Sequence, residues 1–167
     1  IRPFNKKLCK TRKLKAEPPK IDGNITWHYL EVKGGKLSKL SLIKKQTKLL
    51  INSLLKEGDE CVIFTDTINP TCISTANFIS RIYQIPTIAI CTDAPQNLTG
   101  VRHSYVSYIL RQASKCYGYL TLTEELNSLF NRNNKPSLII EGVCDDREIN
   151  TGAIGIETPY FFFGGAL

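Results

Sequence analysis

Two polar segments that follow short apolar runs are the places where this sequence could do chemistry. Thr92 and Asp93 come directly after the apolar residues 87–91, and a carboxylate there can hydrogen-bond a substrate hydroxyl or act as a base. The same carboxylate could instead close an Asx turn or cap a helix. Thr123 and Glu124 follow a second run, where a hydroxyl and an acid also start and stabilise a helix.

The histidines and cysteines offer weaker candidates. His103 lies beside Arg102 before an expected helix, where it could face an anion or be merely solvated, and His28 lies mid-strand and is expected to be structural. No two of the six cysteines are within four positions of each other, so no zinc or redox half-site is present. We therefore expect reduced thiols in the cytosol and no bound metal. The cysteines are Cys9, Cys61, Cys72, Cys91, Cys116 and Cys144.

The positive charge is concentrated in one segment. The 167 residues carry 22 Lys or Arg against 15 Asp or Glu, a net charge of +7. Residues 1–20 hold eight of the basic residues and one acid, so the rest of the chain is neutral. Such an arm can attract nucleic acid or an anionic membrane surface, or remain solvated. Because the body is not basic, we expect no nucleic-acid binding. No apolar run approaches the ~18 residues of a membrane-spanning helix.

Strand-like and helical segments alternate along the chain. We expect strands at residues 61–64, 87–91, 118–122 and 137–141, a β-rich run at 25–32 and a last strand at 160–163. We expect helices at residues 37–56, 71–83, 104–114 and 123–131, with Gly58 as the C-cap of the first. This alternation predicts the α/β class, with a Rossmann-like parallel sheet and helices on both faces. Ligands then gather at the carboxyl ends of the strands.

Four segments carry a resemblance to a known family. They are Ile-Cys-Thr-Asp at 90–93, the strand-to-helix step at 119–127, the segment 136–145, which ends in Glu-Gly-Val-Cys-Asp, and Phe-Gly-Gly at 163–165. In order and spacing, over roughly residues 25–167, the chain resembles the amino-terminal half of retaining glycosyltransferases of the family 4 type, which have the two-domain GT-B fold. Two positions depart from the family pattern: Thr92 stands where the family has His, and Glu141 where it has Asn.

The resemblance implies transfer of a hexose from a nucleotide-sugar to a glycan or lipid-linked acceptor, with this half binding the acceptor. It implies no metal and no cofactor beyond the donor substrate. Asp93 is the implied catalytic residue. The implied acceptor-binding residues are Thr92, Pro95, His103, Thr123 and Glu124. The implied donor-binding residues are Gly142, Gly164 and Gly165. Because the family histidine is Thr92 here, the role of that imidazole does not transfer.

The expected organisation has three parts: a basic arm or loop at residues 1–24, a Rossmann-like acceptor-side domain at 25–145, and a linker with the start of a donor-binding domain at 146–167. The chain begins at Ile1 and contains no methionine, so we expect a piece of a longer protein or a sequence that lacks some residues. A piece of this extent is expected to be inactive without the carboxyl-terminal domain. We expect a cytoplasmic location, with docking of the arm on the inner membrane face.

Three other interpretations stay open. One is a stand-alone phosphate- or nucleotide-binding α/β module, although no phosphate loop is visible near the first strand. Another is a nucleic-acid-binding protein that uses the basic arm. The third is a non-catalytic remnant of a glycosyltransferase, because fold likeness does not fix function.

Overall fold

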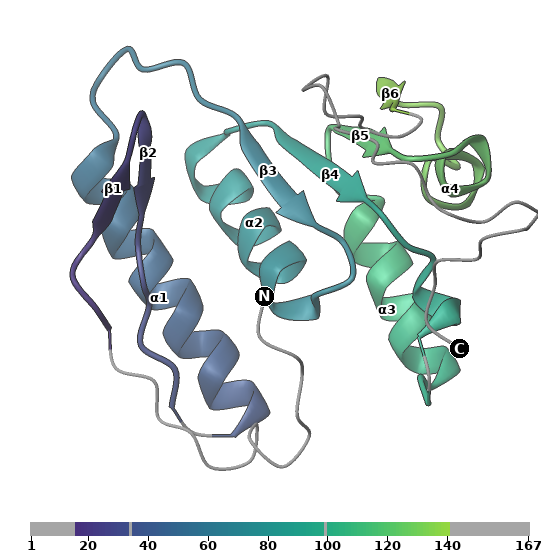
Figure 1. Cartoon of the computed structure of the whole chain (residues 1–167), viewed down its shortest axis with the longest axis horizontal. Coiled ribbons are helices and arrows are strands. Elements are labelled where there is room, and N and C mark those ends of the chain that lie inside the picture. The colour runs from purple at the N-terminus through teal and green to yellow at the C-terminus, as the bar shows by residue number, and fades with distance from the viewer. Residues whose placement is uncertain (1–15, 34, 99, 141–167) are drawn as a thin grey trace, which may run out of the picture.

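A four-stranded parallel sheet is the centre of the computed structural model, which describes residues 16–33, 35–98 and 100–140. The strands are β3 (Ile63–Asp66), β4 (Thr87–Cys91), β5 (Gly118–Thr121) and β6 (Ser137–Ile139), and they lie in that order. They alternate with α2 (Pro70–Tyr83), α3 (His103–Ala113) and α4 (Glu124–Phe130), and the short 3-10 helix η2 (Pro95–Asn97) precedes α3 (Figure 1). The prediction of a Rossmann-like α/β fold is confirmed.

The described helices of the sheet share one core on one face. Ala89 lies opposite Tyr119 in the β4–β5 register, and both are buried. Ile73 of α2, Ile109 of α3 and Phe130 of α4 join them in a single apolar cluster. The strand order explains this, because successive right-handed crossovers that move in one direction bring every helix to the same face.

The opposite face of the sheet is apolar except for Asp66, which shares this face with Phe64 at the end of β3. Phe64 and Leu138, at its two sides, are 58% and 60% exposed. The residues between them on this face are the half-buried Ile88, Ile90 and Leu120. We expected helices on both faces; within the described ranges, the helices that reach the sheet pack on the face of Ala89 and Tyr119.

A long helix and a hairpin precede the sheet. Helix α1 (Lys36–Leu54) packs against α2, and its Gln46 side chain holds the backbone of Glu31 through hydrogen bonds of 2.8 and 2.9 Å. Leu55, not Gly58, occupies the C-cap position, because the chain leaves the helix in an extended conformation before the turn at Gly58, where φ is +87°. The prediction of Gly58 as C-cap is therefore wrong.

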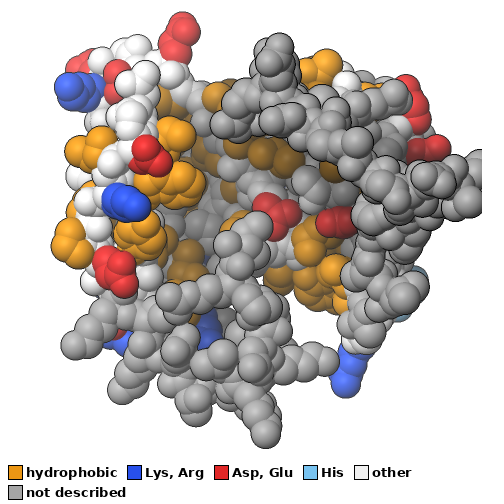
Figure 2. All heavy atoms as spheres, in the orientation of Figure 1, with side chains coloured by type: hydrophobic (Ala, Val, Ile, Leu, Met, Phe, Trp, Pro, Cys, Tyr) orange, Lys and Arg blue, Asp and Glu red, His pale blue; other side chains and the backbone are white. Residues whose placement is uncertain are grey.

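The hairpin pairs β1 (Lys20–Asp22) with β2 (Ile25–Trp27) around Gly23, whose φ of +57° suits glycine. The expected β-rich run therefore ends at Trp27, and its partner strand begins inside the segment expected to be a basic arm. Ile21, Ile25 and Trp27 are at least half exposed. Figure 2 shows hydrophobic side chains on the left of the molecule, where Figure 1, in the same orientation, draws the hairpin and α1.

The other boundaries lie close to the expected ones. The strand expected at residues 61–64 is Ile63–Asp66, whereas β4 has the predicted bounds. Helix α2 begins with Pro70. The preceding residue, Asn69, caps the helix, because its side chain accepts a 3.0 Å hydrogen bond from the Thr71 amide. The expected strand at residues 160–163 and the segment 146–167 lie outside the described residues, as do Cys9 and Cys144.

Candidate functional site

The carboxyl ends of β4 and β5 bring two of the predicted polar segments together. Cys91 pairs with Thr121 in the parallel register, so the residues that follow each strand leave the sheet side by side. Thr92, Asp93 and Thr123 line one depression of about 690 Å³ at this edge. The depression is also lined by Ala94, Gln96, Asn97, Glu125, Leu126, Ser128, Leu129 and Arg132. We call it the carboxyl-edge depression.

Asp93 is one of two exposed carboxylates of this depression, with Glu125. Within the part of the chain that the structure describes, its side chain makes no hydrogen bond and no ion pair. The neighbouring 3-10 helix begins after Ala94 without any side-chain cap. Among the described residues, the alternative role of Asp93 as a turn or helix cap is therefore not seen.

Asp66 is a second carboxylate at the same edge, and it holds the backbone of its own loop. It is the last residue of β3, and its two oxygens accept hydrogen bonds from the amides of Ile68 and Asn69 at 2.9 and 3.2 Å. These bonds shape the loop that leads into α2, where the hydroxyl of Tyr105 also donates to the Ile68 carbonyl at 2.5 Å. Asp66 therefore stabilises its loop, whereas the Asp93 side chain bonds no group in the described ranges.

Thr123 has a structural role as well as a place in the depression. Its hydroxyl oxygen accepts a 3.3 Å hydrogen bond from the Leu126 amide and caps α4, as the sequence predicted. The Thr123 side chain and the backbone amide of Glu125 together hold the pKa of the Glu125 carboxyl below its ordinary value. Glu125 is therefore an anion at neutral pH, beside Asp93 in the same lining.

Three predicted acceptor residues do not line this depression. Pro95 is fully buried at the start of η2. His103 is exposed as the first residue of α3, and its Nδ1 lies 3.3 Å from the Ser107 hydroxyl. Glu124 is exposed in the first turn of α4, but the lining residue is its neighbour Glu125. The predicted donor residues Gly142, Gly164 and Gly165 lie outside the described residues.

Sequence reasoning missed five polar residues of the lining: Gln96, Asn97, Glu125, Ser128 and Arg132. Ser128 could have been found from its position three residues after Glu125, which places both on one face of α4. Gln96 and Asn97 carried no such signal, because the 3-10 turn decides which way they lie. Arg132 follows the end of α4, so helical spacing does not reach it.

The described residues contain no group of three or more His, Cys, Asp or Glu side chains that could hold a metal ion. Within residues 16–33, 35–98 and 100–140, no helix is both long and apolar enough to cross a membrane. Comparisons with protein-family models, with curated proteins and with solved structures gave no match to this chain.

Proposed function

We propose that this chain is the acceptor-binding part of a glycosyltransferase that moves a sugar from a nucleotide-sugar to a glycan or lipid-linked acceptor. The observation that carries the proposal is that the Asp93 carboxylate, which bonds no described residue, lines one depression with Thr92 and Thr123. The segments around residues 90–93 and 119–127, which carry the family resemblance, supply these side chains.

The composition of the depression suits a carbohydrate. A sugar presents many hydroxyl groups, each of which donates and accepts hydrogen bonds. The carboxylates, amides and hydroxyls of the lining offer both acceptors and donors to such groups. Ala94, Leu126 and Leu129 add an apolar surface for the carbon–hydrogen face of a ring. A volume of about 690 Å³ lies within the range of small-molecule sites, roughly 300–1,000 Å³.

In the proposed reaction, an acceptor hydroxyl attacks the anomeric carbon of the donor sugar. The bond from that carbon to the diphosphate breaks, and a nucleoside diphosphate leaves. Asp93 accepts a hydrogen bond from the attacking hydroxyl and holds it in place, which lowers the entropic part of the barrier. The proton of that hydroxyl passes to the departing diphosphate. The donor is held by Gly142, Gly164, Gly165 and a carboxyl-terminal domain, as the resemblance implies.

Saturation-transfer NMR with a panel of neutral methyl glycosides tests the acceptor site on the 167-residue chain. We expect at least one glycoside to bind, and Asp93→Asn to weaken it by about fivefold, because one charge-assisted hydrogen bond is lost. Glu57→Gln is the matched control, since this acid is exposed on the loop after α1, away from the depression. Equal weakening by both variants, or no saturable binding, would contradict the acceptor assignment.

The donor assignment has its own test. A longer chain that contains a carboxyl-terminal domain should bind nucleotide-sugar, and the 167-residue chain should not. In that longer enzyme, Asp93→Asn should slow transfer by at least about tenfold. Equal donor binding by the short chain would contradict the division into acceptor and donor parts, and would favour a stand-alone nucleotide-binding module.

The basic arm is proposed to dock a cytoplasmic enzyme on an anionic membrane, where a lipid-linked acceptor lies. Replacing Lys6, Lys7, Lys10, Arg12 and Lys13 by Gln should weaken binding to vesicles that contain phosphatidylserine, and added salt should weaken the unmodified chain in the same way. Vesicle binding that ignores both changes would contradict this role. Salt-dependent binding of a labelled oligonucleotide would favour the nucleic-acid alternative instead.

A further inference from the structure

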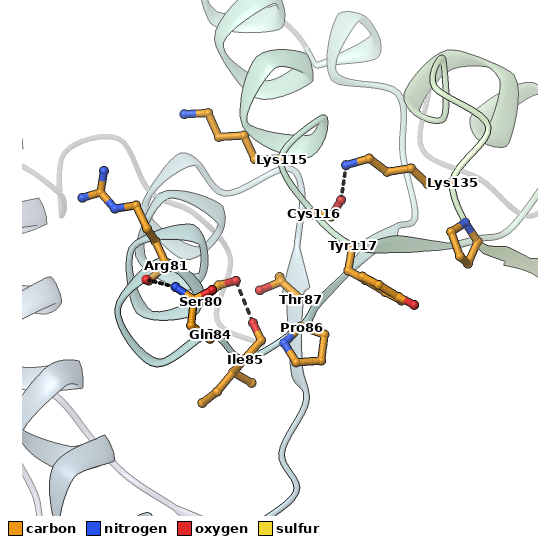
Figure 3. Close-up of a pocket in the computed structure, with 11 residues that line it drawn as sticks. Ser80, Arg81, Gln84, Ile85, Pro86, Thr87, Lys115, Cys116, Tyr117 and Lys135 are labelled. Carbon is orange, nitrogen blue, oxygen red and sulfur yellow. Dashed lines mark hydrogen bonds between the residues drawn. The ribbon is translucent and has the colours of Figure 1, made fainter.

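A second depression, of about 920 Å³, lies at the opposite, amino-terminal edge of the sheet. It is formed where α2 and α3 end and where β4, β5 and β6 begin (Figure 3). We call it the amino-edge depression. Its lining residues are Ser80, Arg81, Gln84, Ile85, Pro86, Thr87, Lys115, Cys116, Tyr117, Lys135 and Pro136. Neither the family resemblance nor the proposed acceptor site gives any of them a binding or catalytic role.

The charged side chains of this lining are all positive. Arg81, Lys115 and Lys135 line it, and no Asp or Glu does. The side chains of Arg81 and Lys115 are exposed and form no ion pair among the described residues. Lys135 donates to the carbonyl groups of Ser114, at 2.7 Å, and Cys116, at the end of α3.

The helix ends do not cancel this charge. The carboxyl ends of α2 and α3 both face the depression, and each contributes roughly half a negative charge. Against three full positive charges, this leaves a surplus of about two. The lining therefore attracts an anion of more than one charge, although Arg81 and Lys135 also stabilise the helix ends.

A buried hydroxyl in the same lining lacks a partner. Thr87 is 1% exposed, and its Oγ1 makes no hydrogen bond. The nearby Ser80 hydroxyl is already used, because it donates to the Ile85 carbonyl at 2.7 Å. In Figure 3 the Thr87 hydroxyl turns to the side on which Ser80 and Arg81 lie. A buried polar group without a partner is costly, and a ligand oxygen would relieve that cost.

The rest of the lining is apolar and includes one exposed ring. Tyr117 is 61% exposed, and Figure 3 shows it with Pro86 on the other side of the depression from Arg81. Pro136 completes this part of the lining. An inorganic phosphate ion would fill only a small part of about 920 Å³, so the depression has room for an organic group beside the anion.

We propose that the amino-edge depression binds an organic phosphate with a planar ring. The phosphate lies against Arg81 and Lys115 and accepts a hydrogen bond from Thr87, and the ring packs against Tyr117, Pro86 and Pro136. This site is separate from the acceptor site at the other edge, so either assignment can fail without the other.

The test is a titration of the ¹⁵N-labelled 167-residue chain with phenyl phosphate, inorganic phosphate and phenol. Phenyl phosphate should shift the amides of Thr87, Lys115 and Tyr117 in a saturable way. It should bind at least about threefold more tightly than inorganic phosphate, because the ring adds apolar contact, and phenol should bind weakest. No saturable shift at these amides, or shifts confined to the basic arm, would overturn the proposal.

Variants distinguish binding at the amino-edge depression from general electrostatic attraction of a phosphate to a basic protein. The double variant Arg81→Gln/Lys115→Gln should weaken phenyl phosphate by at least about tenfold. Arg132→Gln removes an exposed cation at the opposite edge and should change the affinity by less than about twofold. Similar weakening in both would mean that only net charge matters, and would overturn the proposal.

Substitution of Thr87 tests the proposed contact most directly, because its hydroxyl makes no hydrogen bond in the structure. Thr87→Val keeps the shape of the side chain, so it should not lower the melting temperature, yet it should weaken phenyl phosphate by about threefold. Thr87→Ser keeps the hydroxyl and should retain the affinity, which preserves the test if the valine variant fails to fold. Full affinity in Thr87→Val, or equal loss in Thr87→Ser, would exclude the Thr87 hydroxyl as a ligand contact.

Discussion

The side-chain amide of Asn131 holds both backbone groups of Lys135. Its Oδ1 accepts a 2.8 Å hydrogen bond from the Lys135 amide, and its Nδ2 donates to the Lys135 carbonyl at 2.8 Å. The turn between them contains Asn134 with a φ of +49°. One nearly buried side chain therefore closes the connection between α4 and β6. It also fixes the residue whose ammonium group caps the end of α3.

Asn131→Ala should lower the free energy of unfolding by about 1–3 kcal/mol, because it leaves two backbone groups without partners. Asn133→Ala, in the exposed part of the same turn, should change it by less than about 0.5 kcal/mol. Urea denaturation of both variants measures the difference. Equal stability of the two variants would show that the turn does not depend on the Asn131 amide.

Asp66 and Asp93 should separate folding from binding. Asp66→Ala removes the acceptor of two backbone amides and should lower the free energy of unfolding by about 1–2 kcal/mol. Asp93→Ala should leave it within about 0.5 kcal/mol, because that side chain is exposed and holds no described group. Thermal unfolding followed by circular dichroism measures both. Destabilisation by Asp93→Ala as large as that of Asp66→Ala would assign Asp93 to the fold.

Thr123 combines a cap with a place in the carboxyl-edge depression, and two variants divide these roles. Thr123→Ala should cost about 1 kcal/mol of stability, because the Leu126 amide loses its acceptor. Thr123→Ser keeps the hydroxyl and should keep the stability. Chemical denaturation of the pair measures the cap. A serine variant as unstable as the alanine variant would mean that the threonine methyl group, not the hydroxyl, supports the start of α4.

The alternation of apolar strands and helices predicted most of the fold, because burial sets that pattern locally. The strand at Thr87–Cys91 and the cap at Thr123 follow from side-chain types alone. The hairpin partner Lys20–Asp22 was missed, since Lys20 and Asp22 are polar and the strand is exposed. The face that the described helices cover could not be foreseen, because it depends on the order of the strands in space.

The candidate site was predictable only in part, because the conformation of its loops does not follow from residue types alone. The carboxyl-edge rule located Thr92, Asp93 and Thr123. It could not tell that Asp66 bonds two amides of its own loop, whereas Asp93 bonds no described residue. That difference arises from the conformation of two loops of similar composition. The amino-edge depression was not predicted at all, because Arg81, Lys115 and Lys135 are far apart in the sequence and meet only where helices and strands end.

Two thiols and one phenol are buried in the core between the sheet and its helices: those of Cys91, Cys116 and Tyr119. Burial raises the pKa of the Cys91 thiol to about 12 and that of the Cys116 thiol to about 11, from an ordinary value of 9.0. Burial likewise raises the pKa of Tyr119 to about 12, and its hydroxyl donates to the Ala113 carbonyl at 3.0 Å. In each case the folded chain keeps a proton that the unfolded chain gives up at lower pH.

The protein should therefore lose stability as the pH rises above about 9. Between pH 9.0 and about 11 to 12 the unfolded chain binds fewer protons than the folded chain, so the free energy of unfolding falls with rising pH. Below pH 9.0 the contribution of both thiols is fully present. Cys91→Ala should flatten this fall, measured as the melting temperature from pH 7 to about 10.5, whatever the variant's stability at neutral pH. Cys61→Ala, at an exposed thiol, should leave the slope as it is. Parallel slopes for the Cys91→Ala variant and the unmodified chain would show that the buried thiol is not the group that titrates.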